Sequence, residues 1–131
     1  VEVLLSGGGL AGIYEALEVF DGHSARLTPE EICRQALDDP ASTAGKALER
    51  FFDIFGSVAG DIALTHGALG GIYLAGGIAM QNQTTLLRSR FAERFQAKGP
   101  MAGYLKDIPV GLIRSEETAL KGAALWFAAH A

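Results

Sequence analysis

The residues best suited to chemistry in this sequence lie around a pair of glycines at the end of a short apolar run. Ile72, Tyr73 and Leu74 favour a buried strand, and the run is too short to be a helix of its own. Gly76 and Gly77 then allow a turn at positive φ and a close approach to the main chain. A ligand or a neighbouring helix can use that space, and these residues alone leave both interpretations open.

A second glycine-rich segment, at residues 7–12, satisfies the pattern G-x-G-x-x-G. In a dinucleotide-binding domain this pattern follows a strand, opens a helix and leads to a second strand that ends in an acidic residue. The stretch after Gly22 instead predicts a capped, acidic helix. We therefore interpret the segment as a turn, and a Rossmann-type dinucleotide-binding domain that uses Gly7, Gly9 and Gly12 is an alternative.

The other polar side chains do not form a recognisable catalytic or metal-binding motif. Ser6 is not embedded in a G-x-S-x-G elbow, which argues against a hydrolase nucleophile. The three histidines have no ligand-like spacing among themselves or with Cys33, so we predict no metal site. Arg88, Arg90 and Arg94 could bind phosphate, but Glu93 interrupts them and the pattern favours a solvated helix face.

Composition places the chain among water-soluble globular domains. Its 131 residues suffice for one domain with a core, and the net charge of −4 argues against a nucleic-acid partner. No apolar run is long enough for a membrane span. The lone cysteine suits a reducing compartment, and we predict a cytoplasmic location. The first residue is Val1 and no polar lead-in precedes the apolar start, which suggests a piece of a longer protein.

The elements that must position these residues are mostly helical. Apolar periodicity predicts helices over residues 10–20, 29–37 and 42–66, and Thr28 and Ser42 are suitable N-caps. On the longest helix, Gly56 and Gly60 lie one turn apart, which predicts close packing of another backbone. A noncatalytic dimerisation module that uses this glycine surface is a further alternative.

The second half of the chain predicts an α/β arrangement, in which a small sheet is packed by several helices. Residues 72–75 and 110–113 read as buried strands, while residues 78–83 read as a loop. We expect helices over residues 84–97 and from Glu117 or Thr118 onward, and one helical turn over residues 101–106. Small residues such as Gly122, Ala123 and Ala124 give the last helix a face able to lie against a sheet.

Taken in order, these segments resemble the C-terminal part of bacterial ATP-dependent glucokinases. The resemblance covers essentially the whole chain, and its segments are specific as a set. It implies an actin-like, hexokinase-like (ribonuclease H-like) ATPase fold, with residues 1–131 as a single domain on the nucleotide side of a two-domain sugar kinase. It rests on Leu-Ser-Gly-Gly-Gly-Leu at 5–10, Gly-Asp-Ile-Ala-Leu at 60–64, Gly-Gly-Ile-Tyr-Leu-Ala-Gly-Gly-Ile at 70–78, Asp-Ile-Pro-Val at 107–110 and Lys-Gly-Ala-Ala at 121–124.

The same resemblance implies which residues bind the nucleotide. The segment 70–78 corresponds to the adenosine motif of such kinases, with contacts from Gly76, Gly77 and Ile78 and further candidates in Gly122 and Ser6. It implies Mg-ATP as phosphoryl donor and the 6-hydroxyl of glucose as acceptor, although no Mg²⁺ ligand is identified in this chain. The sequence departs from the family at Gly8, where proline is common.

Three motifs of these kinases do not occur in this sequence, which implies that this chain alone is inactive. They are the Asp-Gly-Gly-Thr phosphate loop, the Asn-Asp pair that holds the general base, and the Glu-x-x-His sugar segment. All belong upstream in the family, so we expect a missing N-terminal part to supply the catalytic base and the sugar ligands. We also expect the full protein to be a homodimer.

Overall fold

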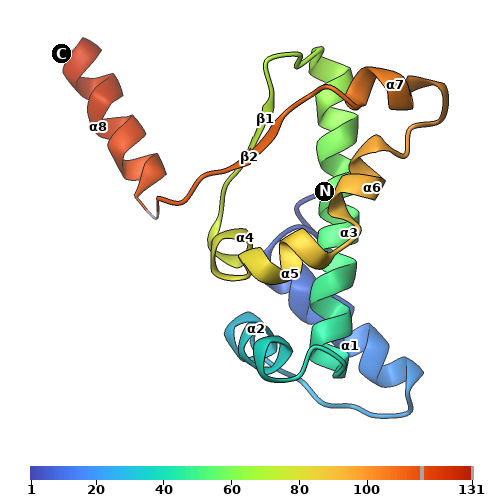
Figure 1. Cartoon of the computed structure of the whole chain (residues 1–131). Helices are drawn as coiled ribbons and strands as arrows, with labels where there is room; N and C mark the ends of the chain where they lie inside the picture. The colour runs from blue at the N-terminus through green and yellow to red at the C-terminus, as the bar shows by residue number, and fades with distance from the viewer. Residues whose placement is uncertain (116, 131) are drawn as a thin grey trace.

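The structure, a computed structural model, describes residues 1–115 and 117–130 and is built around one long helix. This helix, α3 (Thr43–His66), contacts α1 (Gly7–Phe20), α2 (Pro29–Asp38), α5 (Gln83–Arg88), α6 (Phe91–Gln96) and α7 (Ala102–Leu105) (Figure 1). Its predicted ends are confirmed. The Ser42 hydroxyl accepts the Gly45 N–H at 3.1 Å, and Gly67 ends the helix in the left-handed region at φ 59°. The fully buried side chains of the core include Leu10, Ile32, Leu48, Phe52 and Leu105.

The glycine pair on α3 packs against α6. A Cβ on Gly56 would overlap the carbonyl oxygen of Phe91, and a Cβ on Gly60 would overlap that of Phe95. The predicted close approach of another backbone is therefore confirmed. Because the approaching backbone is α6 of the same chain, this face is not free for a second copy, and the dimerisation module based on it is wrong.

The N-terminal glycine segment forms the first turns of α1. Ser6 caps the helix by accepting the Gly9 N–H at 3.1 Å, so α1 begins at Gly7, earlier than the predicted start at residue 10. Residues 1–5 form a turn in which the Leu5 N–H donates to the Val1 carbonyl at 2.9 Å. The strand that a dinucleotide fingerprint requires is thus not formed by these residues. A Cβ on Gly9 would overlap the Leu4 carbonyl, so close packing explains this glycine.

Two short parallel strands form the sheet of this α/β chain. β1 (Ile72–Leu74) pairs with β2 (Val110–Leu112), with Tyr73 opposite Gly111. The crossover between them runs through α4 (Gly77–Gln81), α5, α6, η1 (Gly99–Met101) and α7. Both strands lie within the predicted ranges, but the prediction that they are buried is wrong, because Tyr73 and Val110 are exposed. The Ile113 N–H still donates to the Leu74 carbonyl at 2.8 Å beyond the end of β2.

The crossover differs from the prediction in two places. The expected loop at residues 78–83 is mostly helical, because α4 begins directly after Gly76. The single helix expected over residues 84–97 is divided at Ser89, whose backbone is extended at φ −68° and ψ 172°. The Ser89 hydroxyl accepts the Phe91 N–H at 3.2 Å and donates to the Leu86 carbonyl at 2.7 Å, which ends α5 and starts α6.

The last helix, α8 (Thr118–His130), extends away from the other helices (Figure 1). Gly122, Ala123 and Ala124 are exposed, so the predicted packing of this face on the sheet is not observed. Leu120, Leu125, Trp126 and Phe127 are also exposed, by between 57% and 72%. Within the ranges 1–115 and 117–130, none of the helices has both the length and the apolar character that crossing a membrane requires.

Candidate functional site

A cavity of about 480 Å³ lies where the start of α1, the start of α2, the middle of α3 and the turn after β1 come together. Figure 1 shows how the chain returns from α3 through β1 to place α4 near α1 and α2. The cavity therefore joins segments that are far apart in the sequence. Its lining residues are Leu5, Ser6, Gly7, Pro29, Glu30, Cys33, Phe51, Phe55, Ala75, Gly76, Gly77, Ile78, Ala79 and Gln81.

The glycine turn after β1 forms one edge of this cavity. Gly76 has φ 119° and ψ 150°, a conformation that a residue with a Cβ rarely adopts. A Cβ on Gly77 would meet no atom within 4 Å, so the main chain here faces open space. The α4 helix that follows has no side-chain cap at its first turn. The turn thus presents bare backbone to whatever occupies the cavity.

The opposite side of the cavity is mainly apolar. Phe51 and Phe55 from α3 line it, with ring centroids 6.3 Å apart. Cys33 from α2 is 8% exposed, and burial raises the pKa of its thiol, an effect partly offset by a hydrogen bond with the Asn82 amide. Among the described lining residues there is no lysine or arginine. The cavity therefore suits an uncharged, partly aromatic group better than a phosphate.

Asn82, between α4 and α5, binds the helix that follows the glycine turn, and the sequence did not identify it. It is 1% exposed, and its Nδ2 and backbone N–H both donate to the carbonyl of Ile78, at 2.9 and 3.1 Å. Its Oδ1 is buried without a hydrogen-bond partner in the part of the chain that the structure describes. An asparagine in a predicted loop is expected to be exposed, so its burial could not be predicted from the sequence. Because residues 78–83 were predicted to be a loop, the sequence also did not predict that Asn82 would join α4 to α5.

The structure brings together four of the five predicted nucleotide-binding residues. Ser6, Gly76, Gly77 and Ile78 line the same cavity, although the Ser6 hydroxyl is engaged in capping α1. Gly122 lies outside it, exposed on α8.

The described residues contain no group of three or more His, Cys, Asp or Glu side chains placed to hold a metal ion. His66 lies at the end of α3, with its Nδ1 3.0 Å from the Ile62 carbonyl oxygen.

Comparison with known proteins gives one consistent result. Residues 1–130 match the family described as Glucokinase. The chain is 44% identical to a glucokinase of Chromobacterium violaceum, covering 98% of this chain and 37% of the relative. It is 40% identical to a glucokinase-like protein of Xylella fastidiosa, covering 97% of this chain and 38% of the relative. A crystal structure of a glucokinase from an Antarctic psychrotroph superimposes with a TM-score of 0.84 at 40% identity, covering 94% of this chain and 38% of that one. The chain thus spans well under half the length of these relatives.

Proposed function

This chain belongs to the glucokinase family, and we propose that it forms the C-terminal, nucleotide-side domain of a two-domain sugar kinase. The proposed fold of the whole is that of the actin-like and hexokinase-like (ribonuclease H-like) ATPases. The parallel sheet, its helical crossover and the similarity to a glucokinase crystal structure support this assignment.

The proposed reaction of the full-length protein is transfer of the γ-phosphoryl group of ATP to the 6-hydroxyl of glucose. Such a reaction depends on positioning and on stabilising charge, with Mg²⁺ neutralising the phosphates. The part of the protein that precedes this chain supplies the catalytic base, the sugar ligands and the phosphate loop. Residues 1–131 supply the surface that holds the adenosine end of ATP.

One observation carries the nucleotide assignment. Ser6 and the Gly76–Ile78 turn, singled out from distant parts of the sequence, line the same cavity. Bare backbone at Gly77 and the aromatic side chains of Phe51 and Phe55 form a slot for a flat base and its ribose. Because the lining lacks a cation, the triphosphate extends out of the cavity toward the rest of the protein.

ATP binding to the 131-residue chain tests this assignment. A valine at Gly77 adds a side chain to the open cavity at a backbone conformation that needs no glycine, so the fold is preserved. We expect the dissociation constant for ATP, measured by calorimetry, to rise about tenfold or more in Gly77→Val, which corresponds to about 1.4 kcal/mol. Gly12→Val is the matched control, because Gly12 also faces open space but lies on α1 outside the cavity. Equal affinities in the two variants would contradict the assignment.

We further propose that the preceding part of the protein covers α8 and the exposed face of the sheet. An apolar helix with no polar side is normally buried, and parallel sheets are normally covered on both faces. Trp126 is the only tryptophan of the sequence and is 57% exposed, while Tyr73 on β1 is 74% exposed. The isolated chain should form no glucose 6-phosphate. Adding the preceding part in trans should shift the Trp126 fluorescence to shorter wavelength, and an unchanged spectrum would contradict this contact.

We also propose that the full-length protein is a cytoplasmic homodimer. Cys33, the lone cysteine of these 131 residues, is buried and suits a reducing compartment. Sedimentation velocity of the full-length protein gives the oligomeric state directly, and a monomer at micromolar concentration would contradict the proposal.

A further inference from the structure

A second cavity, of about 330 Å³, lies on the other side of α3 and differs from the first in its charge. Lys46, Glu49, Arg50 and Asp53 repeat every three or four residues and so share one face of α3, about half a turn from Phe51 and Phe55. Across from them the junction of α5 and α6 contributes Arg88, Ser89 and Arg90. Arg88 and Arg90 are exposed, as the sequence predicts, and they line the same cavity as Lys46 and Arg50 of α3.

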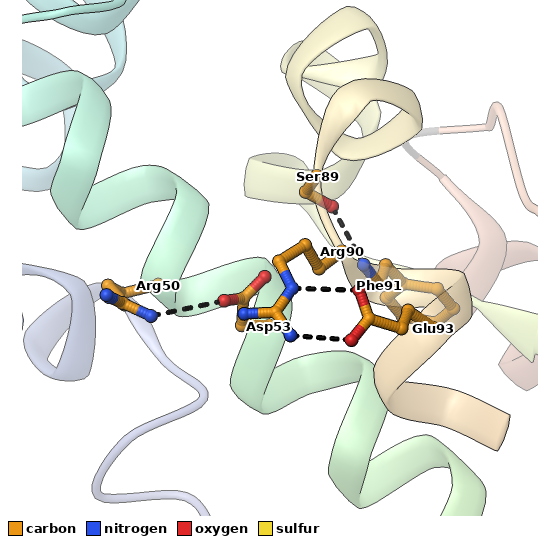
Figure 2. A network of polar contacts seen from close by, with 6 residues as sticks. All are labelled: Arg50, Asp53, Ser89, Arg90, Phe91 and Glu93. Carbon is orange, nitrogen blue, oxygen red and sulfur yellow. Dashed lines mark hydrogen bonds and ion pairs between the residues drawn. The ribbon is translucent and has the colours of Figure 1, made fainter. Parts of the chain in front are cut away.

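The polar contacts within this cavity leave two cations without an ion-pair partner among the described residues. Figure 2 shows Arg50 reaching Asp53, with the Nη1 to Oδ2 distance at 3.5 Å, and Arg90 binding Glu93 with two nitrogens. Glu93 accepts both hydrogen bonds from Arg90, and these bonds lower the pKa of the Glu93 carboxyl. Lys46 and Arg88 take part in neither pair.

The balance of charge in this cavity is opposite to that of the whole chain. Four cationic side chains and two carboxylates line it, whereas the whole chain has a net charge of −4. The excess of cations over carboxylates in this lining favours an anionic ligand. Arg88, which is outside both ion pairs, has a guanidinium group whose paired donors match a phosphate group.

The two carboxylates in the lining, Glu49 and Asp53, limit the kinds of ligand that can bind here. Asp53 is 8% exposed and makes a single long contact with Arg50, so its carboxylate has acceptor capacity left at the cavity wall. Glu49 is exposed beside it. Carboxylates repel a phosphate but accept hydrogen bonds from hydroxyl groups. A ligand that satisfies both halves of the lining carries a phosphate at one end and hydroxyls at the other.

We propose that this cavity binds a small phosphate monoester that carries hydroxyl groups, with Lys46 and Arg88 holding the phosphate and Glu49 and Asp53 accepting from the hydroxyls. The volume is at the lower end of the range for small-molecule sites. The site is separate from the nucleotide cavity, because the two cavities share no lining residue. Its existence does not depend on the nucleotide assignment.

Glucose 6-phosphate is the probe for this site, with glucose and inorganic phosphate as comparators. We expect the 131-residue chain to bind glucose 6-phosphate more tightly than inorganic phosphate, and not to bind glucose. In a ¹⁵N-labelled sample, titration should move the amide resonances of Ser89 and Arg90 and leave those of Gly76 and Gly77 in place. Shifts confined to the glycine turn, or no binding at all, would overturn the proposal.

The variant that tests the cations is Lys46→Gln combined with Arg88→Gln. Both side chains are exposed, so the fold should be retained and a thermal melt checks that it is. We expect the affinity for glucose 6-phosphate to fall by about fivefold or more, and binding to the original chain to weaken as salt is added. Arg94→Gln is the control, because Arg94 lies on α6 but does not line the cavity. An unchanged affinity in the double variant would overturn the proposal.

Discussion

Gly56 on α3 lies directly against the backbone of Phe91 on α6, so that a Cβ on this glycine would overlap the Phe91 carbonyl oxygen. Because the obstacle is main chain, it cannot move aside as a flexible side chain would. We expect Gly56→Ala to lower the free energy of unfolding by about 1–3 kcal/mol, the usual cost of overpacking. Urea denaturation measures this change.

The matched control is Gly12→Ala on α1. A Cβ on Gly12 would meet no atom within 4 Å, and alanine favours a helix over glycine by about 1 kcal/mol. This variant should therefore be as stable as the original chain or more stable. Equal stability changes in Gly56→Ala and Gly12→Ala would show that α3 and α6 are not in close contact.

Cys33 reports on the proposed nucleotide cavity through its reactivity. Its thiol is buried, and its pKa is raised above the ordinary 9.0. The thiolate is the reactive form, so alkylation by iodoacetamide at pH 8 should be slower than for a free thiol and should continue to accelerate above pH 9. Saturating ATP should slow it further, because Cys33 lines the cavity. Rapid labelling that ATP does not affect would contradict this placement.

The capping box at the start of α2 predicts a dependence of stability on pH. The Glu31 carboxylate accepts the Thr28 N–H at 2.8 Å, and this hydrogen bond lowers the pKa of Glu31 below its ordinary 4.5. The folded chain therefore holds the charged form more strongly than the unfolded chain does. The resulting stabilisation is present above pH 4.5 and is lost as the pH falls through the lowered pKa.

Two variants separate charge from hydrogen bonding at this cap. Glu31→Gln keeps an acceptor for the Thr28 N–H, so it should retain the cap but lose its share of the pH dependence. Glu31→Ala should be less stable than the original chain at pH 7 and should approach it near pH 3. Urea midpoints between pH 3 and pH 7 provide the comparison, and parallel curves for all three proteins would contradict a role for Glu31.

Asn82 is buried, so a charged side chain at this position would be unfavourable. Aspartate at this position would replace the Nδ2 that donates to the Ile78 carbonyl with an oxygen that repels it. Burial would also raise the pKa of the new carboxyl. We expect Asn82→Asp to cost about 3 kcal/mol of stability at pH 7, and less as the pH falls toward the raised pKa.

Gln83→Glu is the corresponding control for Asn82→Asp. The Gln83 Nε2 also donates to a carbonyl within the same corner, that of Met80, at 2.9 Å, but the residue is only half-buried. Its substitution should have a much smaller effect. A similar loss of stability in both variants would show that burial of Asn82 is not the cause.

The helices with local signals could be predicted from the sequence. Ser42 and Gly67 delimit α3, and Thr28 with Glu31 starts α2, because each of these side chains or backbone conformations acts within its own turn. The division of the later helix at Ser89 could not be read in the same way. There the Ser89 hydroxyl binds backbone groups on both sides of it, and the backbone of α6 packs against Gly56, a contact between residues far apart in the sequence.

The candidate site was predictable to a similar extent. Gly76 and Gly77 could be predicted from the sequence, because a turn that needs residues without Cβ atoms is a local property. Ser6 was predicted from the family resemblance. Gly122 was expected beside them, yet α8 extends away from the cavity. The basic cavity escaped prediction because Lys46 and Arg88 are brought together only by tertiary packing, which periodicity does not reveal.

The central position of α3 also determines which segments of the chain exchange their amide hydrogens first and which last. Its amide hydrogens are held in a 24-residue helix that contacts five other helices, so they can exchange with deuterium only when most of those contacts are lost together. The amides of α8 lack such cover and should exchange early. Hydrogen–deuterium exchange measured by mass spectrometry should therefore show the strongest protection of amide hydrogens between residues 43 and 66.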